Sequence, residues 1–219
     1  MVAENLITTA VLPLQTSDTG EESLAVMEDF NVRHLPIVNN KQLLGLISEE
    51  DILAHNVEEP IGSYELSLIK PYVKKEDHLY EVMRLLAEHQ LTVIPVIDEE
   101  GDYMGMVSLE DVLNFFAKTA AFSETGSIVV LEFQPRSYSL AEIARIVEGE
   151  NASILSTFVT SNPESSVVEV TLKINRQDIH NILKSFERFG YEIKASFNEE
   201  EYLESLQERF DALMSYLNV

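Results

Sequence analysis

Apolar and polar residues alternate along the first half of the chain in a pattern that occurs twice, in the order strand, helix, strand, strand, helix. Apolar residues with helical spacing follow a polar start near Ser17 or Asp18, which predicts the first helix. The elements predicted for the first copy are an extended piece over 10–15, this helix, strands over 34–38 and 43–47, and a short helix over 49–55. Those predicted for the second copy are an extended piece over 71–73, a helix over 78–89, strands over 92–97 and 103–107, and a helix over 109–117.

The two copies also share individual residues. Pro36 corresponds to Pro95 at an offset of 59. After one inserted residue, a second group corresponds at an offset of 60: Gly45, Ser48, Glu50, Asp51 and Leu53 with Gly105, Ser108, Glu110, Asp111 and Leu113. Such a duplication indicates two copies of one supersecondary unit, with an intervening cleft that presents both copies of any short polar motif.

The second half of the chain predicts a different unit, in the order β-α-β-β-α-β, which is typical of a split βαβ sandwich. A small, polar stretch over 118–126 precedes it and is predicted to be a linker. Two helix starts are predicted, at Ser139, which opens a capping box, and at Asn175. Gly190 stands where a helix commonly ends. The predicted strands span 127–133, 152–160, 165–174 and 191–197, with a turn over 161–164.

The last segment, 198–219, predicts an amphipathic helix. Its apolar residues follow a short heptad-like spacing: Leu203, Leu206, Phe210, Leu213 and Leu217. Fewer than three heptads leave two interpretations open, a helix docked on its own chain and a contact in a dimer.

Composition excludes several classes of function. The 219 residues contain no cysteine, which excludes disulfides, thiolate metal sites and thiol catalysis. A net charge of −23 would repel the phosphate backbone of a nucleic acid. No apolar run is long enough to span a membrane, and no signal peptide is evident, so a cytoplasmic protein without a membrane partner is expected. The acidic excess fits a solvated surface, and it also fits a basic partner or a divalent cation.

The repeated G-x-x-S-x-x-D motif is the strongest chemical signal. The glycine would let a ligand approach the strand, and a hydroxyl and a carboxylate at the following junction could bind the two vicinal hydroxyls of a sugar. The same Ser-x-x-Asp spacing also forms a helix capping box, so both interpretations stand.

On the residues HLPIV…GLISEED and VIPVI…GMVSLED, the first half resembles a tandem CBS (cystathionine-β-synthase) domain pair, also called a Bateman module. This resemblance implies an adenosine-containing ligand in the cleft, such as AMP, ATP, S-adenosylmethionine or NAD, with no required cofactor. Ser48 with Asp51, and Ser108 with Asp111, would each hold a ribose. Ile37 and Val96, beside the two prolines, would contact adenine.

Residues 126–197 resemble an ACT domain, a small βαββαβ sensing module with a ferredoxin-like fold. The loop 134–139 (QPRSYS) lacks the glycine common in ligand-binding members, so oligomerisation is favoured over amino-acid binding. The order of units is similar to that of the acetoin-utilisation AcuB family. The expected fold is thus mixed α/β and α+β, a pseudo-symmetric CBS pair, an ACT-like domain and a C-terminal helix. The expected boundaries are 1–60, 61–120, 121–126 (linker), 127–197 and 198–219.

One departure from the CBS pattern concerns the position before each aspartate. Many members that bind phosphorylated ligands carry a base there, but this chain has Glu50 and Glu110. A carboxylate about 4–6 Å from a phosphate costs on the order of 1 kcal/mol or more, which disfavours AMP and ATP. Lys74, Lys75 and His78 form the basic cluster expected to compensate, with Arg33 and His34 as weaker candidates.

No catalytic motif or metal-binding histidine spacing is present, so neither catalytic nor metal-ligating residues are assigned. We therefore expect a non-enzymatic regulatory protein, a homodimer that binds a small-molecule effector and acts on an unknown client. The alternative is an interaction scaffold with degenerate ligand sites.

Overall fold

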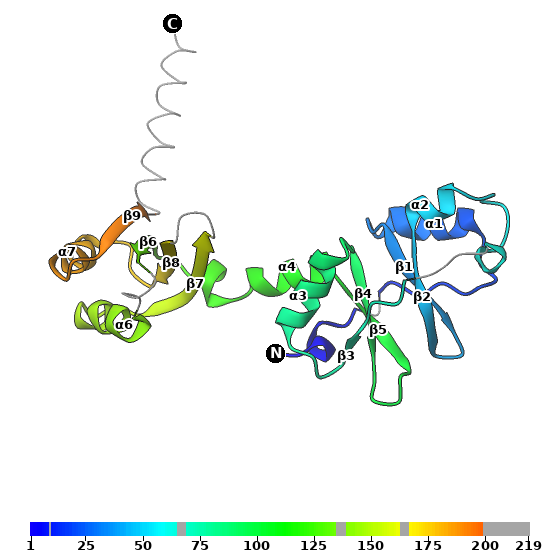
Figure 1. Ribbon diagram of the computed structural model, residues 1–219, viewed down its shortest axis with the longest axis horizontal. Coiled ribbons are helices and arrows are strands. Elements are labelled where there is room, and N and C mark those ends of the chain that lie inside the picture. The colour runs from blue at the N-terminus through cyan, green and yellow to red at the C-terminus, as the bar shows by residue number, and fades with distance from the viewer. Residues whose placement is uncertain (9, 65–68, 135–138, 163–166, 199–219) are drawn as a thin grey trace, which may run out of the picture. The chain divides into compact units, whose positions relative to one another are not determined.

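The computed structural model describes residues 1–8, 10–64, 69–134, 139–162 and 167–198, and divides the chain into two compact units, Met1–Phe116 (unit 1) and Ala117–Val219 (unit 2). Both helices and sheets are present, as the sequence predicts (Figure 1). The predicted C-terminal helix and most of the loop 134–139 lie outside the described residues.

Unit 1 contains the two copies of the repeat. The first copy consists of η1 (Ala3–Leu6), α1 (Gly20–Asp29), β1 (His34–Asn39), β2 (Gln42–Ser48) and α2 (Glu49–Leu53). The second consists of η2 (Ile61–Ser63), β3 (Val73–Lys74), α3 (Leu79–Glu88), β4 (Val93–Ile97), β5 (Tyr103–Ser108) and α4 (Leu109–Ala117). The hairpins β1–β2 and β4–β5 are antiparallel, and a register shift interrupts each at the corresponding place.

The two copies exchange their leading segments. Thr8 of the first copy bridges Met106 on β5, and Ile69 of the second copy bridges Leu46 on β2. The backbone hydrogen bonds of these bridges are both 2.9 Å long. One continuous core of buried apolar residues joins the copies as a result, so neither copy buries its apolar face alone.

The first helix begins later than predicted, at Gly20. Thr19 is its N-cap. Its side chain accepts a hydrogen bond from the backbone N–H of Glu22, and the Glu22 carboxylate accepts one from Thr19 N. Asp18 instead accepts a hydrogen bond from Gln15 N at 2.8 Å. The capping box therefore formed one residue beyond the predicted start, because Glu22 supplies the reciprocal partner to Thr19.

Unit 2 is a four-stranded antiparallel sheet in the order β7-β8-β6-β9, and α6 and α7 lie together on one of its faces (Figure 1). Its elements are α5 (Ala120–Ser123), β6 (Ser127–Phe133), α6 (Leu140–Gly149), β7 (Ile154–Asn162), β8 (Val167–Ile174), α7 (His180–Arg188) and β9 (Glu192–Phe197). Residues of β6 are alternately buried and partly exposed, as expected for a sheet with one covered face. This is the predicted βαββαβ arrangement, with the short helix α5 inside the expected linker.

The predicted cap at Asn175 is wrong. The side chain of Asn175 accepts a hydrogen bond from Ser153 N at 2.7 Å, so it joins β8 to the start of β7. The helix α7 begins five residues later, at His180. Ile179, Ile182 and Phe186 are buried, and Gly190, which stands after the helix end as predicted, has a φ of +81°.

Candidate functional site

Each Ser-x-x-Asp pair lies at a junction between a strand and a helix. Ser48 ends β2, and its hydroxyl donates to Asp51 Oδ2 at 2.6 Å and accepts from Asp51 N at 3.1 Å. The corresponding distances between Ser108 and Asp111, after β5, are 2.6 and 3.0 Å. Both aspartates also accept from the serine backbone N–H, at 3.0 and 2.9 Å. Each pair is thus a complete capping box, and the capping interpretation is confirmed at both sites.

A cavity of about 270 Å³ opens at the first of these junctions. Residues of both copies line it: Arg33, His34, Ser48, Glu49, Glu50, His89 and Gln90. Its volume is close to the lower end of the range for small-molecule sites, ~300–1,000 Å³. Asp51, which is bonded to Ser48, is not itself among the lining residues. The structure therefore unites Ser48 with polar groups of the second copy.

His34 and Thr92 join the two copies at this cavity. Thr92 N donates to His34 Nδ1 at 3.3 Å, and Thr92 Oγ1 lies 3.2 Å from the same nitrogen. Thr92 Oγ1 also accepts from Arg33 N at 2.9 Å. In the tautomer that accepts this backbone N–H at Nδ1, the neutral ring carries its proton on Nε2.

Burial lowers the pKa of His34 below its usual value, and the neighbouring Arg33 lowers it further, against the opposing effect of Asp51 and Glu50. The cavity lining therefore contains the guanidinium of Arg33, the carboxylates of Glu49 and Glu50, and the imidazoles of His34 and His89. This balance places negative charge where a phosphate would have to bind.

The basic cluster expected to offset Glu50 lies elsewhere. Lys74 pairs with Ile97 at the carboxyl end of β4, whereas the cavity lies at the amino end of β1, where His34 pairs with Ser48. Lys75 forms ion pairs with Glu76 at 3.4 Å and Glu99 at 3.9 Å, and these carboxylates raise its pKa.

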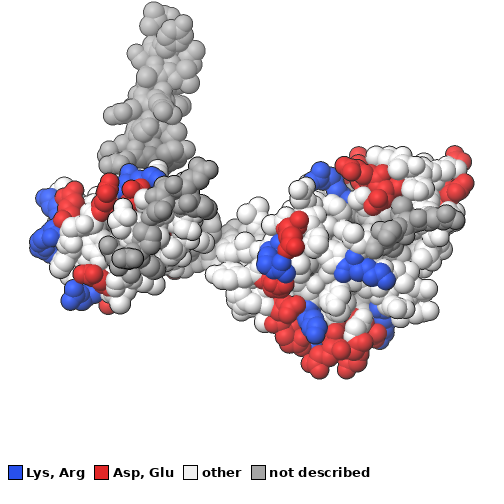
Figure 2. All heavy atoms as spheres, in the orientation of Figure 1, with Lys and Arg blue, Asp and Glu red and all other residues white. Residues whose placement is uncertain are grey.

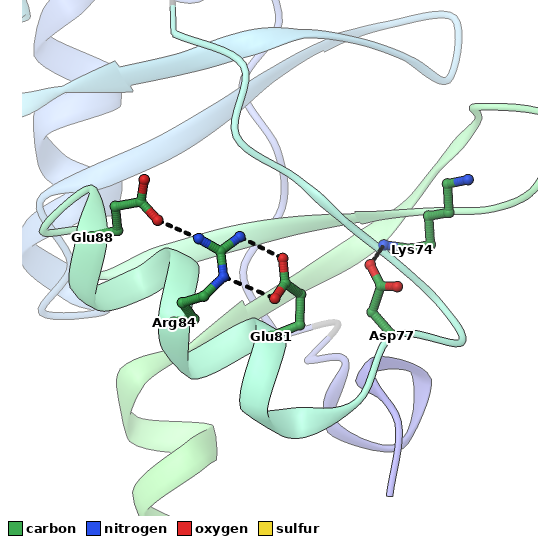
Figure 3. A network of polar contacts seen from close by, with 5 residues as sticks. All are labelled: Lys74, Asp77, Glu81, Arg84 and Glu88. Carbon is green, nitrogen blue, oxygen red and sulfur yellow. Dashed lines mark hydrogen bonds and ion pairs between the residues drawn. The ribbon is translucent and has the colours of Figure 1, made fainter.

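The other groups of that region have structural partners. Asp77 accepts from Lys74 N at 2.7 Å in the turn before α3, and the Lys74 ammonium points away from this contact (Figure 3). On α3, Arg84 is held between Glu81 and Glu88 (Figure 3). His78 caps α3 by accepting from Tyr80 N at 3.2 Å. Lys74, Lys75 and His78 therefore do not line the cavity at Ser48, whereas the weaker candidates, Arg33 and His34, do.

Ile37 and Val96 both belong to the core. Their exposed fractions are 3% and 0%, and they pair with Gly45 and Gly105 across the two hairpins. Their contact with adenine stays a prediction, and their burial argues against it in the arrangement seen here.

Gly105 allows close packing of the N-terminal segment against β5. A Cβ atom built on it would lie 2.4 Å from Ile7 Cγ2, and its φ is +155°. The predicted close approach is therefore made by the N-terminal segment, which occupies the space that a ligand was expected to fill.

Sequence reasoning missed Thr92, His89 and Gln90. They belong to the second copy and carry no motif of their own. The repeat could have identified Thr92, because Thr92 corresponds to Arg33 at the offset of 59. Equivalent positions of two copies come into contact where the copies pack around a pseudo-twofold axis, and Arg33 N does bond to Thr92 Oγ1.

Two further properties concern the described residues. Among them, no group of three or more His, Asp or Glu side chains is arranged to hold a metal ion. Within the same ranges, none of the helices combines the length and the apolar character that crossing a membrane would require.

Comparison with known proteins identifies the family of unit 1. The sequence model of the CBS domain family matches the chain twice, at residues 2–58 and 67–118. Homoserine O-acetyltransferase of Methanococcus vannielii is 26% identical over 121 residues, which are 52% of this chain and 24% of that protein. The CBS domain-containing protein YhcV of Bacillus subtilis is 26% identical over 118 residues, 50% of this chain and 81% of YhcV.

The first curated relatives are much longer proteins, of which the chain spans about a quarter. Among solved structures, a CBS domain pair/ACT domain protein from Thermotoga maritima is 26% identical, with a TM-score of 0.48, and the match covers 54% of this chain and 98% of that one. Other similar solved structures are CBSX2 in complex with AMP and the cytosolic domain of the Mg2+ channel MgtE in complex with ATP. With two copies of the domain in unit 1, the chain belongs to the family of tandem CBS-domain proteins.

Proposed function

We propose that the chain is a non-enzymatic regulatory sensor that binds an adenosine-containing ligand in the cavity at Ser48. The observation that carries the proposal is the arrangement of Ser48, Arg33 and His34 around one cavity whose walls come from both CBS domains. A ligand held there contacts two copies at once, so its binding depends on how they are arranged.

The charge of the cavity selects among adenosyl compounds. Glu49 and Glu50 outnumber Arg33, and His34 is neutral at pH 7. An interaction with two carboxylates favours a cation or a neutral nucleoside over a phosphate. S-adenosylmethionine, with its sulfonium and ammonium groups, is therefore preferred over AMP, ATP and NAD.

The signal is a population shift. A ligand that prefers one arrangement of the two CBS domains raises the population of that arrangement by its differential affinity. Unit 2, as an ACT-like domain at 127–197, would hold two protomers together and pass the change to a partner copy or a client protein. The remaining boundaries are those that the sequence predicts: CBS domains at 1–60 and 61–120, a linker at 121–126 and a C-terminal segment at 198–219.

Calorimetry tests the ligand. Separate titrations with S-adenosylmethionine, AMP, ATP and NAD should give saturable heat for S-adenosylmethionine and weaker or no heat for the phosphates. In Glu50→Lys the preference should reverse, since the charge at the cavity changes by two, and AMP should gain about tenfold or more in affinity. Glu58→Lys is the matched control, because Glu58 does not line the cavity. Absence of heat and of a thermal shift with all four compounds would defeat the ligand part of the proposal.

One observation favours the alternative, an interaction scaffold with degenerate sites. Both serine–aspartate pairs are already complete capping boxes, so helix capping alone accounts for their hydrogen bonds. A scaffold predicts that Ser48→Ala/Asp51→Ala combined with Ser108→Ala/Asp111→Ala retains the oligomeric state and client binding. The sensor predicts that these changes remove ligand-dependent behaviour. Analytical ultracentrifugation with and without S-adenosylmethionine separates the two.

A further inference from the structure

A second cavity lies in unit 2, far from any CBS motif in the sequence. It has a volume of about 310 Å³ and lies between α6 and α7, the two helices that cover the sheet. Polar groups of both helices and two apolar residues line it: Arg145, Ile146, Glu150, Ser185, Arg188 and Phe189. Basic side chains are visible at the edge of unit 2 where these helices lie (Figures 1 and 2).

Ser185 is the fixed polar group at this site. Its exposed fraction is only 4%, and its hydroxyl donates to Glu150 Oε1 at 2.7 Å. Arg188 Nη2 donates to the same hydroxyl at 3.2 Å, and the guanidinium lies 5.5 Å from the centre of the Phe189 ring. These contacts favour one orientation of the exposed Arg188 guanidinium and use one of its five N–H donors.

Arg145 reaches the cavity from the other helix. Its side chain is 72% exposed, and its ion pair with Glu142 is long, at 3.9 Å. The position of Arg188 in the last turn of α7 also suits the negative end of the helix dipole, but that effect does not account for Arg145 on α6. Two arginines from separate helices thus line one cavity of a strongly acidic chain.

Charge and shape define the ligand. The lining residues comprise two arginines and one carboxylate, Glu150, and a second carboxylate, Glu142, pairs with Arg145 from outside the lining, so the charges around the cavity balance. Because the site has no excess positive charge, a dianionic phosphate would lose more solvation free energy than it regains there, which favours a monoanion. Guanidinium forks bind carboxylates in a planar, bidentate way, and Ile146 and Phe189 supply an apolar wall beside them. We propose that this cavity binds a small monocarboxylate with a short apolar tail, independently of the CBS cleft.

The test uses the full chain and butyrate as the probe. Side-chain N–H signals of the arginines and the amide of Ser185, followed by NMR at constant ionic strength, should shift saturably with butyrate, and less with phosphate or chloride. Arg188→Gln and Arg145→Gln should each weaken butyrate binding about tenfold or more, the loss expected for one charge-assisted hydrogen bond. Lys184→Gln is the matched control, because it removes the same charge from the exposed side of α7 without touching the cavity, and its affinity should stay within about twofold.

Three results would overturn the proposal. They are a shift that does not saturate, an equal loss of affinity in Lys184→Gln, and tighter binding of phosphate than of butyrate. Arg145→Gln keeps the test valid if Arg188→Gln disturbs the fold, because Arg145 is exposed and only weakly paired. A titration with S-adenosylmethionine in the same sample reports on the CBS cleft separately.

Discussion

Substitution of the two capping serines separates their structural role from a role in binding. Ser48→Ala removes the bond that its hydroxyl donates to Asp51 and the one it accepts from Asp51 N, and leaves the backbone bond of Ser48 N in place. Ser108→Ala removes the same two bonds to Asp111. Because the two boxes agree in each distance to within 0.1 Å, the variants should lose the same free energy of unfolding, ~1 kcal/mol.

The two variants should differ in ligand binding. Ser48 lines the cavity with Arg33 and His34, whereas Ser108 does not. Loss of one hydrogen bond to the ligand, worth ~0.5–1.5 kcal/mol, corresponds to a decrease in affinity of about two- to twelvefold. We therefore expect this decrease in Ser48→Ala and a change of less than about twofold in Ser108→Ala.

Urea unfolding followed by circular dichroism gives the stability, and calorimetry with S-adenosylmethionine gives the affinity. The reasoning would be refuted if both variants lost affinity equally, or if Ser48→Ala lost stability without any loss of affinity. The second outcome would show that the serine serves only as a cap.

Three other outcomes follow from the structure. His34 has a lowered pKa, so the unfolded chain binds a proton at this residue more readily than the folded chain does. The stability that neutral His34 contributes should be fully present above about pH 6.5 and should fall as the pH decreases toward the lower pKa of the folded state. In a pH series of urea unfolding midpoints, His34→Gln should show a flatter curve over this range. Gly105→Ala should destabilise unit 1 by ~1–3 kcal/mol, because the new Cβ would lie 2.4 Å from Ile7 Cγ2. In a double-mutant cycle, Ile7→Ala combined with Gly105→Ala should restore part of the lost stability. Additive losses of stability in the two variants would contradict the contact between Ile7 and Gly105. Phe186→Ala, at a side chain with no exposed surface, should destabilise unit 2 by ~3–5 kcal/mol in thermal unfolding, while binding of S-adenosylmethionine to unit 1 stays unchanged.

The helices, strands and capping boxes of this protein could be predicted from the sequence because they depend on residues that are neighbours along the chain. Helical spacing, strand composition and the two Ser-x-x-Asp boxes involve contacts within a few positions, and the helix α4 and the strand β6 occupy the residues predicted for them. The errors arose where a local rule had two candidate partners. Asn175 could cap the next helix or bond across to Ser153, and only the folded sheet brings Ser153 N within reach.

The candidate site depended on contacts between distant residues. The pairing of Arg33 and His34 with Thr92, and the approach of Ile7 to Gly105, connect residues of different copies of the repeat. A repeated pattern shows that two copies exist, but it does not state which segments they exchange.

The sequence by itself determined the duplication, the order of the helices and hairpins and the position of the two serine–aspartate caps, because each follows from short-range periodicity and hydrogen bonding. The leading strand predicted over 10–15 is only an isolated bridge at Leu14. Tertiary structure alone decided which polar groups share a cavity. It placed Arg33 and His34 beside Ser48, kept Lys75 in ion pairs with Glu76 and Glu99, and filled the space at Gly105 with Ile7. The physical reason is that the apolar faces of the two CBS domains can be buried only together, and the way they pack fixes every contact between them.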